Sequence, residues 1–141
     1  MKKITGGVTA AKGFEAAAAA AGIKYENRTD MALVYSEKPC VTAGTFTTNK
    51  VFAAPVKWDR NIVYNEDFAQ AVVVNSGVAN ACTGVEGDNA CAEEAKAVAK
   101  VLNVPENAVL IGSTGVIGMQ LPVDRICAGI EKLAPMLDAS L

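Results

Sequence analysis

The strongest constraint on the fold is a strand–helix–strand pattern in the second half of the chain. A continuous apolar run occupies 71–74 and ends in Asn-Ser-Gly, and a second apolar run occupies 109–111. Between these runs, the segment 89–102 repeats apolar residues at helical spacing, and Asp88 or Asn89 can cap it. We therefore expect two buried strands with an amphipathic helix between them, an order typical of α/β proteins.

The first half of the chain is expected to be mostly extended. The apolar run at 31–35 predicts a strand, and β-branched and aromatic residues continue beyond it. Two or three strands are therefore expected between 31 and 57. The alanine run at 16–21 instead favours a helix that Gly22 closes, although an isolated segment this short is marginal as a helix.

A last helix is expected near the C-terminus. Pro122 occupies a favoured first-turn position, and apolar residues then recur at helical spacing to about 137. Its apolar face consists of Val123, Ile126, Ile130 and Leu133. The expected fold class is therefore α/β, a mixed sheet packed with helices, and we expect one domain over residues 1–141 because no linker or repeat divides the chain.

Composition excludes several classes of function. The 13 basic and 15 acidic residues give a formal charge of −2 and form no basic stripe, so no nucleic-acid partner is expected. The chain has no histidine and no C-x-x-C pair, so no metal site is expected and a Cys–His nucleophile cannot form within it. Cys40, Cys82, Cys91 and Cys127 are interpreted as small buried hydrophobic residues in a reducing cytosol. The hydrophobic share of 51% suggests a surface covered by a partner chain.

The N-terminus superficially resembles a signal peptide. Lys2 and Lys3 precede the alanine run, but Lys12 and Glu15 interrupt the pattern. No stretch reaches the roughly 20 apolar residues that a membrane helix needs. We therefore expect a cytoplasmic protein with no membrane partner.

Two polar segments have both a functional and a structural interpretation. The loop NSGVANACTG, 75–84, either lines a pocket or forms a turn in which Asn75 and Asn80 bond the backbone, and the turn is favoured. The pair Glu93–Glu94 is expected on the solvated face of its helix rather than in acid–base catalysis. A third segment, GGVTAAKGF, lacks the spacing of a phosphate-binding loop and is interpreted as a surface or interface segment.

The turn GSTG, 112–115, is the candidate with the most specific chemistry. A strand that ends in this way can present consecutive backbone N–H groups beside a hydroxyl, which suits an anion or an oxyanion. A plain strand-to-helix turn is an equally good interpretation of four such residues. No convincing base or nucleophile accompanies the turn, so the chain would carry only part of an active site.

Three motifs together resemble one family. GGVTAAKGF, NSGVANACTG and STGVIG…LP occur in the order found in the N-terminal part of the ornithine acetyltransferase family of arginine biosynthesis, also called bifunctional glutamate N-acetyltransferase, and the resemblance covers essentially the whole chain. It implies a precursor that cleaves itself into an α and a β chain, with the first threonine of the β chain as nucleophile and its own α-amine as base. The 141 residues would be most of the α chain, in an α2β2 assembly whose β chain completes the fold.

The resemblance also implies a reaction. Acetyl passes from N2-acetylornithine to the threonine and then to glutamate, without a cofactor, and some members also accept acetyl-CoA as a co-substrate. The family's oxyanion hole falls on Thr114, through its hydroxyl, and on Gly115, through its backbone N–H. Two alternatives remain: a self-processing amidase or aminopeptidase of the same architecture, in which water replaces glutamate, and a stand-alone anion-binding module.

Overall fold

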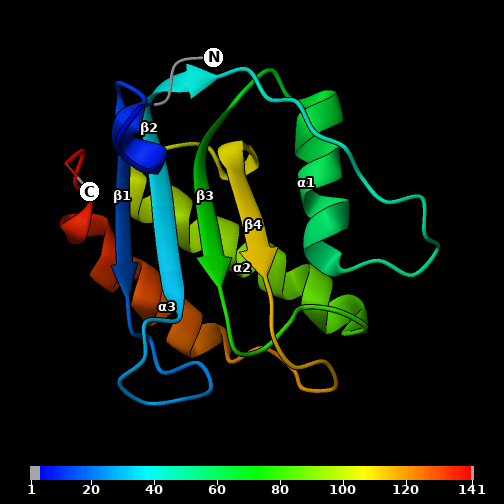
Figure 1. Ribbon diagram of the computed structural model, residues 1–141. Coiled ribbons are helices and arrows are strands. Elements are labelled where there is room, and N and C mark those ends of the chain that lie inside the picture. Colours follow the sequence, from blue (N-terminus) through cyan, green and yellow to red (C-terminus); the bar gives the residue numbers. More distant parts are fainter. Residues whose placement is uncertain (1–3, 141) are drawn as a thin grey trace.

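The computed structural model describes residues 4–140 and contains a four-stranded mixed sheet with helices behind it (Figure 1). The strands lie in the order β1 (Phe14–Ala19), β2 (Met31–Cys40), β3 (Ala69–Asn75) and β4 (Val109–Ser113). Neighbouring strands are antiparallel from β1 to β3, whereas β4 runs parallel to β3. The predicted α/β class and the mixed sheet are confirmed.

Three α-helices accompany the sheet: α1 (Ala54–Asn65), α2 (Gly84–Leu102) and α3 (Val123–Leu133). Short 3-10 segments occupy Val8–Ala10, Glu106–Ala108 and Ala134–Met136. In Figure 1, α2 and α3 cross behind the strands and α1 stands beside β4. Because α2 lies between β3 and β4 in the chain, these parallel strands are joined by a helical crossover, as parallel pairing requires.

The core lies between the sheet and α2 and α3. One row of side chains crosses all four strands on this face: Ala17, Leu33, Val73 and Ile111 pair in register, and each is at most 3% exposed. The helices contribute Val98 from α2 and the fully buried Ile126, Ile130 and Leu133 from α3. Three of the four residues predicted for the apolar face of the last helix are thus buried, and Val123 is partly buried.

The alanine run does not form the predicted helix. Residues 14–19 form β1 instead, and Ala17 and Ala19 are buried in the core. Strand pairing with β2 and packing against α3 outweigh the helical propensity of alanine, which is only a weak local preference.

The prediction of two or three strands between 31 and 57 is also wrong. That stretch contains one strand, β2, followed by irregular chain, and α1 begins at Ala54 with Pro55 in its first turn. A proline at this position is a helix-start signal because it has no N–H to leave unbonded. The β-branched and aromatic residues at 45–52 obscured that signal.

The predictions for the second half of the chain agree better with the structure. The runs 71–74 and 109–111 lie within β3 and β4, but the helix expected at 89–102 begins earlier, at Gly84. The last helix ends at Leu133 rather than near 137, where a 3-10 turn replaces it. Pro122 precedes the first turn of α3 instead of lying in it.

α1 supplies hydrogen-bond partners to the edge strand β4. The Ile111 N–H donates to Asp59 Oδ1 at 2.9 Å, and Trp58 Nε1–H donates to the Val109 carbonyl at 2.9 Å. Burial raises the pKa of Asp59 from 3.8 to about 6, although the bond from Ile111 lowers it. An edge strand whose backbone groups are bonded in this way is protected from pairing with another chain.

The segment 6–14 is mostly exposed, which agrees with its interpretation as a surface or interface segment.

The four cysteines differ in burial. Cys91 is buried, but Cys40 and Cys127 are half-buried and Cys82 is exposed, so the prediction of four buried thiols is wrong for Cys82. Cys82 lies in a surface loop with a positive φ, where packing does not enclose it.

None of the helices within residues 4–140 has the length and apolar character needed to span a bilayer. Lys2 and Lys3, the basic residues of the pattern that resembles a signal peptide, lie outside the described residues. The two ends of the predicted domain, Met1 and Leu141, also lie outside them.

Candidate active site

The GSTG turn lies where the two parallel strands end. β3 ends at Asn75 and β4 at Ser113, so the loops that follow them leave the sheet at the same edge. An isolated parallel bridge between Val78 and Val116 ties these loops together. Ligands of α/β proteins commonly bind at this edge of a sheet.

Hydrogen bonds fix the backbone on both sides of Gly115. The Thr114 N–H donates to the Asn75 carbonyl at 3.0 Å, and the Val116 N–H donates to the Gly77 carbonyl at 3.1 Å. Between these two bonded amides, the Gly115 N–H donates to no group within residues 4–140, and the exposed Thr114 hydroxyl has no partner there either. The turn therefore holds two adjacent free donors that are exposed, on a backbone that is fixed on either side.

Only glycine fits at position 115. Its φ of +137° is rarely adopted by L residues, and an added Cβ would lie 2.6 Å from the Val78 nitrogen and even closer to the Gly77 carbonyl. The contact is with backbone atoms, which cannot rotate away. Gly115 therefore lets the two loops approach each other closely.

A cavity of about 310 Å³ opens beside the donors. Three loops line it: Thr114, Gly115 and Val116 from the first, Ser76 and Gly77 from the second, and Lys24, Tyr25, Arg28 and Asp30 from the loop between β1 and β2. Sequence reasoning identified residues in the first two loops but missed the third. No local motif marks the third loop, which long-range strand pairing brings to this edge.

Asp30 holds the β1–β2 loop in place. The residue is 7% exposed, and its carboxylate accepts two backbone hydrogen bonds, from Ala21 at 2.7 Å and from Ile23 at 2.8 Å. Its own carbonyl accepts a bond from the Ser76 N–H at 2.8 Å. The loop that carries Lys24 and Arg28 is thus anchored beside the cavity.

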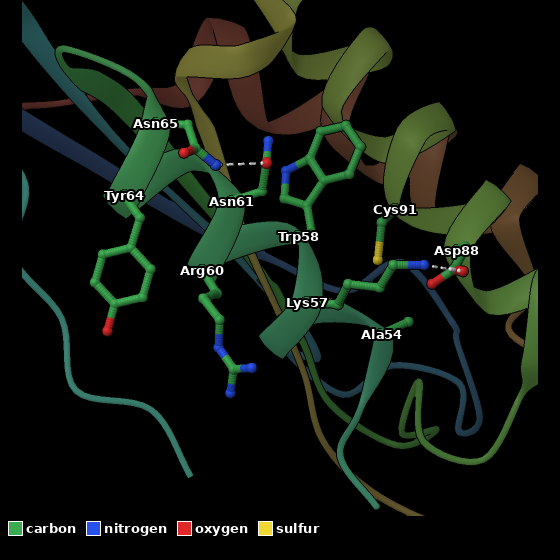
Figure 2. Close-up of a pocket in the computed structure, with 9 residues that line it drawn as sticks. All are labelled: Ala54, Lys57, Trp58, Arg60, Asn61, Tyr64, Asn65, Asp88 and Cys91. Atoms are coloured by element: carbon green, nitrogen blue, oxygen red, sulfur yellow. Dashed lines mark hydrogen bonds and ion pairs between the residues drawn. The ribbon is translucent and has the colours of Figure 1, made fainter. Parts of the chain in front are cut away.

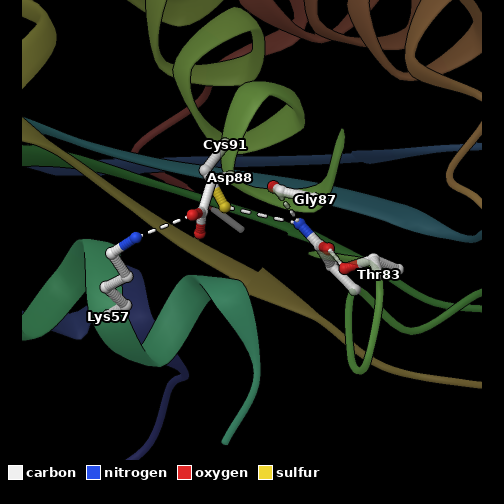
Figure 3. Close-up of polar contacts among 6 residues, drawn as sticks. Lys57, Thr83, Gly87, Asp88 and Cys91 are labelled. Carbon is white, nitrogen blue, oxygen red and sulfur yellow. Dashed lines mark hydrogen bonds and ion pairs between the residues drawn. The ribbon is translucent and has the colours of Figure 1, made fainter. Parts of the chain in front are cut away.

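The loop NSGVANACTG is bonded largely within itself and to α2. Asn75 Nδ2 donates to the Val78 carbonyl at 3.0 Å, and Asn80 Nδ2 donates to the Gly87 carbonyl at 2.9 Å. The Thr83 hydroxyl donates to Asn80 Oδ1 at 2.6 Å (Figure 3). The structural interpretation of these asparagines is confirmed, and only Ser76 and Gly77 of this loop reach the cavity.

Cys91 lies next to this cluster, 3.4 Å from Asn80 Nδ2 (Figure 3). Burial, together with nearby carboxylates, raises the pKa of the Cys91 thiol to about 12. A thiol with so high a pKa is not a nucleophile at neutral pH. The buried cysteine is therefore part of the core.

The prediction that Glu93 and Glu94 both lie on a solvated face is wrong for Glu94. Glu93 is exposed, but Glu94 is 1% exposed, and its Oε1 has no hydrogen-bond partner within the described residues. Burial raises the pKa of Glu94 from 4.5 to about 8. Its spacing from Ala90, Cys91 and Val98 places it on the buried stripe of α2, a signal that the sequence contained.

A larger cavity of about 600 Å³ lies between α1 and α2 (Figure 2). It contains no residue of the GSTG turn, and its charged groups and its indole already have partners. Lys57 Nζ pairs with Asp88 Oδ2 at 2.6 Å, the Trp58 indole donates to the Val109 carbonyl of β4, and Arg60 donates to the Thr47 carbonyl. Sequence reasoning missed this cavity because it expected extended chain where α1 forms. The smaller cavity is the better candidate site because a free backbone N–H and a free hydroxyl lie side by side in it and two unpaired cations line it.

The fold and the turn together define an α/β domain with a donor pair suited to an oxyanion at the ends of two parallel strands. The sequence profile of the ArgJ family matches residues 15–140. The chain belongs to the ArgJ family.

Three relatives illustrate the match. The arginine biosynthesis bifunctional protein ArgJ of Gloeobacter violaceus is 50% identical over 130 residues, which are 92% of this chain and 32% of that protein. The crystal structure of the protein of the same name from Bacillus halodurans has 42% identity and a TM-score of 0.85 over 91% of this chain and 66% of that chain. Ornithine acetyltransferase from Mycobacterium tuberculosis, solved with ornithine, has 42% identity and a TM-score of 0.89 over 94% of this chain and 72% of that chain.

These comparisons confirm the resemblance stated from the three motifs and the four-stranded α/β fold. The chain spans about a third of the length of the curated relatives it matches.

Proposed function

We propose that this chain is the α part of an acyltransferase that moves acetyl from N2-acetylornithine to glutamate in arginine biosynthesis. The free donor pair of Thr114 and Gly115, in a chain of the ArgJ family, is the observation that carries the proposal. The Mycobacterium tuberculosis relative was solved with ornithine, which is a product of the proposed transfer. The proposed location is the cytoplasm.

The donors act on the charge that develops during transfer. A threonine at the start of the β chain attacks the acetyl carbonyl, and its own α-amine takes the hydroxyl proton. The carbonyl oxygen becomes an oxyanion, which the Thr114 hydroxyl and the Gly115 N–H stabilise. Collapse of this intermediate expels ornithine, whose nitrogen receives the proton, and leaves acetyl on the threonine.

The second half of the reaction uses the same donors. The amine of glutamate attacks the acetyl-threonine carbonyl, the oxyanion forms again, and the threonine oxygen leaves as it regains a proton. Histidine is not needed because the threonine supplies its own base. Acetyl-CoA as an alternative acetyl donor stays a prediction of the family resemblance.

The sheet face opposite α2 and α3 is the observation that favours a partner chain. Two rows of small apolar residues cross this face in register: Ala18, Ala32, Val74 and Gly112, and next to them Ala16, Val34, Val72 and Leu110. These residues are half-buried or exposed, because α2 and α3 cover the opposite face. An apolar sheet face needs a second layer, and we propose that the β chain of the same precursor supplies it in an α2β2 assembly.

The proposal is tested on the complete product of the gene that encodes this chain. We expect two chains by intact mass and release of ornithine from N2-acetylornithine that depends on glutamate. Release at the same rate without glutamate would indicate the amidase or aminopeptidase alternative. A gene that ends near codon 141 and a single binding-competent chain would support the stand-alone anion-binding module instead.

A further inference from the structure

The cavity beside the donor pair contains two cationic side chains without an acidic partner. Within residues 4–140 the one ion pair joins Lys57 and Asp88, so neither Lys24 nor Arg28 is paired. Asp30 also lines the cavity, but both of its carboxylate oxygens already accept backbone hydrogen bonds. The cavity therefore has positive charge available for a ligand.

Both cations lie near the aromatic ring of Tyr25. Lys24 Nζ lies 5.0 Å from the centroid of the Tyr25 ring, and the Arg28 guanidinium carbon lies 5.8 Å from it. Attraction to the ring face offsets part of the repulsion between the like charges. Glu26 lies on the same loop and is exposed, but it does not line the cavity.

The loop is held before any ligand arrives. The Asp30 carboxylate bonds the two ends of the loop to each other, and the Cβ of Lys24 packs so closely on Gly77 that a Cβ added at that glycine would lie 3.1 Å from it. Preorganised charges bind a ligand at a lower entropic cost than charges on a mobile loop. Lys24 and Arg28 are exposed, but the backbone that carries them is held, so the cations and the donor pair line one cavity with a fixed backbone.

We propose that Lys24 and Arg28 form a carboxylate-binding subsite that holds the α-carboxylate of both amino-acid substrates. The proposal rests on the function proposed above. In N2-acetylornithine the α-carboxylate is attached to the carbon that bears the acetylated nitrogen. In glutamate it is attached to the carbon that bears the attacking amine, so one subsite beside Thr114 and Gly115 serves both halves of the reaction.

The size and the chemistry of the cavity fit this ligand. A volume of about 310 Å³ accommodates one amino acid with its acyl group. The Arg28 guanidinium can bind a carboxylate through two parallel hydrogen bonds, and the Lys24 ammonium adds a point charge. The two hydrogen-bonding functions are then separate: the glycine turn binds the carbonyl oxygen and the β1–β2 loop binds the carboxylate.

The test uses the full-length protein with Lys24→Met, Arg28→Gln and the double variant. Its substrates are N2-acetylornithine and the corresponding α-carboxamide, which keeps the acetyl group but lacks the charge. We expect the double variant to raise KM for N2-acetylornithine by about 10–100-fold and to leave KM for the amide within a few-fold. Lys12→Met is the matched control, because Lys12 is an exposed lysine at the opposite end of β1, and it should change neither value.

Calorimetric binding of both compounds to the same variants gives a readout that does not depend on turnover. Loss of affinity for the carboxylate but not for the amide supports the subsite even if no acetyl is transferred, in which case the proposed reaction alone fails. Equal losses for the carboxylate and the amide, or unchanged KM and affinity in the double variant, would overturn the subsite. If either of these outcomes overturns the subsite while acetyl transfer stays normal, the proposed reaction still stands.

Discussion

The loop after β3 and the loop after β4 have similar residues, but their polar groups have different partners. In the first loop, the side chains of Asn75, Asn80 and Thr83 donate to neighbouring groups of the protein. In the second, the Thr114 hydroxyl and the Gly115 N–H have no partner within residues 4–140. Composition thus identifies a polar loop, whereas the hydrogen-bond partners decide which loop can bind a substrate.

Burial explains the difference. Asn80 is 0% exposed beneath the first turns of α2, so its polar atoms must bond to the protein or remain unsatisfied at considerable cost. Thr114 and Gly115 are exposed, and water can satisfy their donors until a substrate replaces it. The first loop is therefore expected to affect mainly stability and the second mainly catalysis.

Replacing Gly115 with alanine should have the largest effect. The new Cβ would collide with the backbone of the first loop, and the Val116–Gly77 hydrogen bond would be lost. We expect acetyl transfer by the full-length protein to fall by at least about 10³-fold and stability to fall by about 3 kcal/mol. Gly118→Ala is the control, because Gly118 also has a positive φ but has open space around it. Equal activities of the two variants would show that the loops need not be in contact.

The helix behind the first loop contains a buried carboxyl that should make stability depend on pH. Because the folded-state pKa of Glu94 is about 8 and its ordinary value is 4.5, the unfolded chain loses this proton first as pH rises. The free energy of unfolding should therefore decrease by up to about 1.4 kcal/mol per pH unit between those values.

The variant Glu94→Gln isolates this contribution. Denaturant unfolding at several pH values should show that it is more stable than the wild type at pH 7, by on the order of 3 kcal/mol, and equal to it near pH 4. Asp59, with a pKa raised to about 6, titrates in both proteins and so cancels in the difference. A difference that does not change with pH would mean that Glu94 is charged when folded.

Asn80→Ala tests the internal bonding of the first loop. It removes the donor to the Gly87 carbonyl and the acceptor of the Thr83 hydroxyl in a buried position. We expect a loss of about 2 kcal/mol in chemical denaturation, with kcat within a few-fold of wild type. Asn65→Ala, on the exposed face of α1, should cost less than about 0.5 kcal/mol. A large loss of kcat at full stability would assign Asn80 to catalysis.

Thr83→Val should have the smallest effect. It removes the hydroxyl that donates to Asn80 Oδ1 but keeps the shape of the side chain. The expected loss is about 1 kcal/mol of stability, visible as a lower Tm, with no change in kcat. An unchanged Tm would indicate that water replaces this hydroxyl.

Apolar runs and helical spacing predicted the parts of the fold that pack on the core. β3 and β4 followed from continuous apolar runs, and the stripe of Ile126, Ile130 and Leu133 followed from helical spacing. The alanine run of β1 has no periodicity to read, so its pairing with β2 decided its structure. α1 was missed because its start signal, Pro55, directly follows residues that favour strands.

The candidate site was predictable only where a local motif marks it. GSTG is contiguous, so its donors were identifiable from the sequence. Lys24 and Arg28 are about 90 positions away and reach the same cavity through the pairing of β1 with β2 and the bonds of Asp30. Glu94 illustrates the opposite case, because its helical spacing placed it on the buried face while its charge suggested solvent.

The comparison of the two loops rests on one substitution made in each of them. Thr114→Val in the full-length protein should reduce kcat for acetyl transfer by about 10²–10³-fold, with Tm and KM close to wild type, whereas Thr83→Val should lower Tm and keep kcat. Thr114→Ser, which keeps the hydroxyl, should restore most of the activity. A Thr114→Val enzyme with kcat within a few-fold of wild type would contradict the oxyanion role, because the free hydroxyl would then contribute nothing to the reaction.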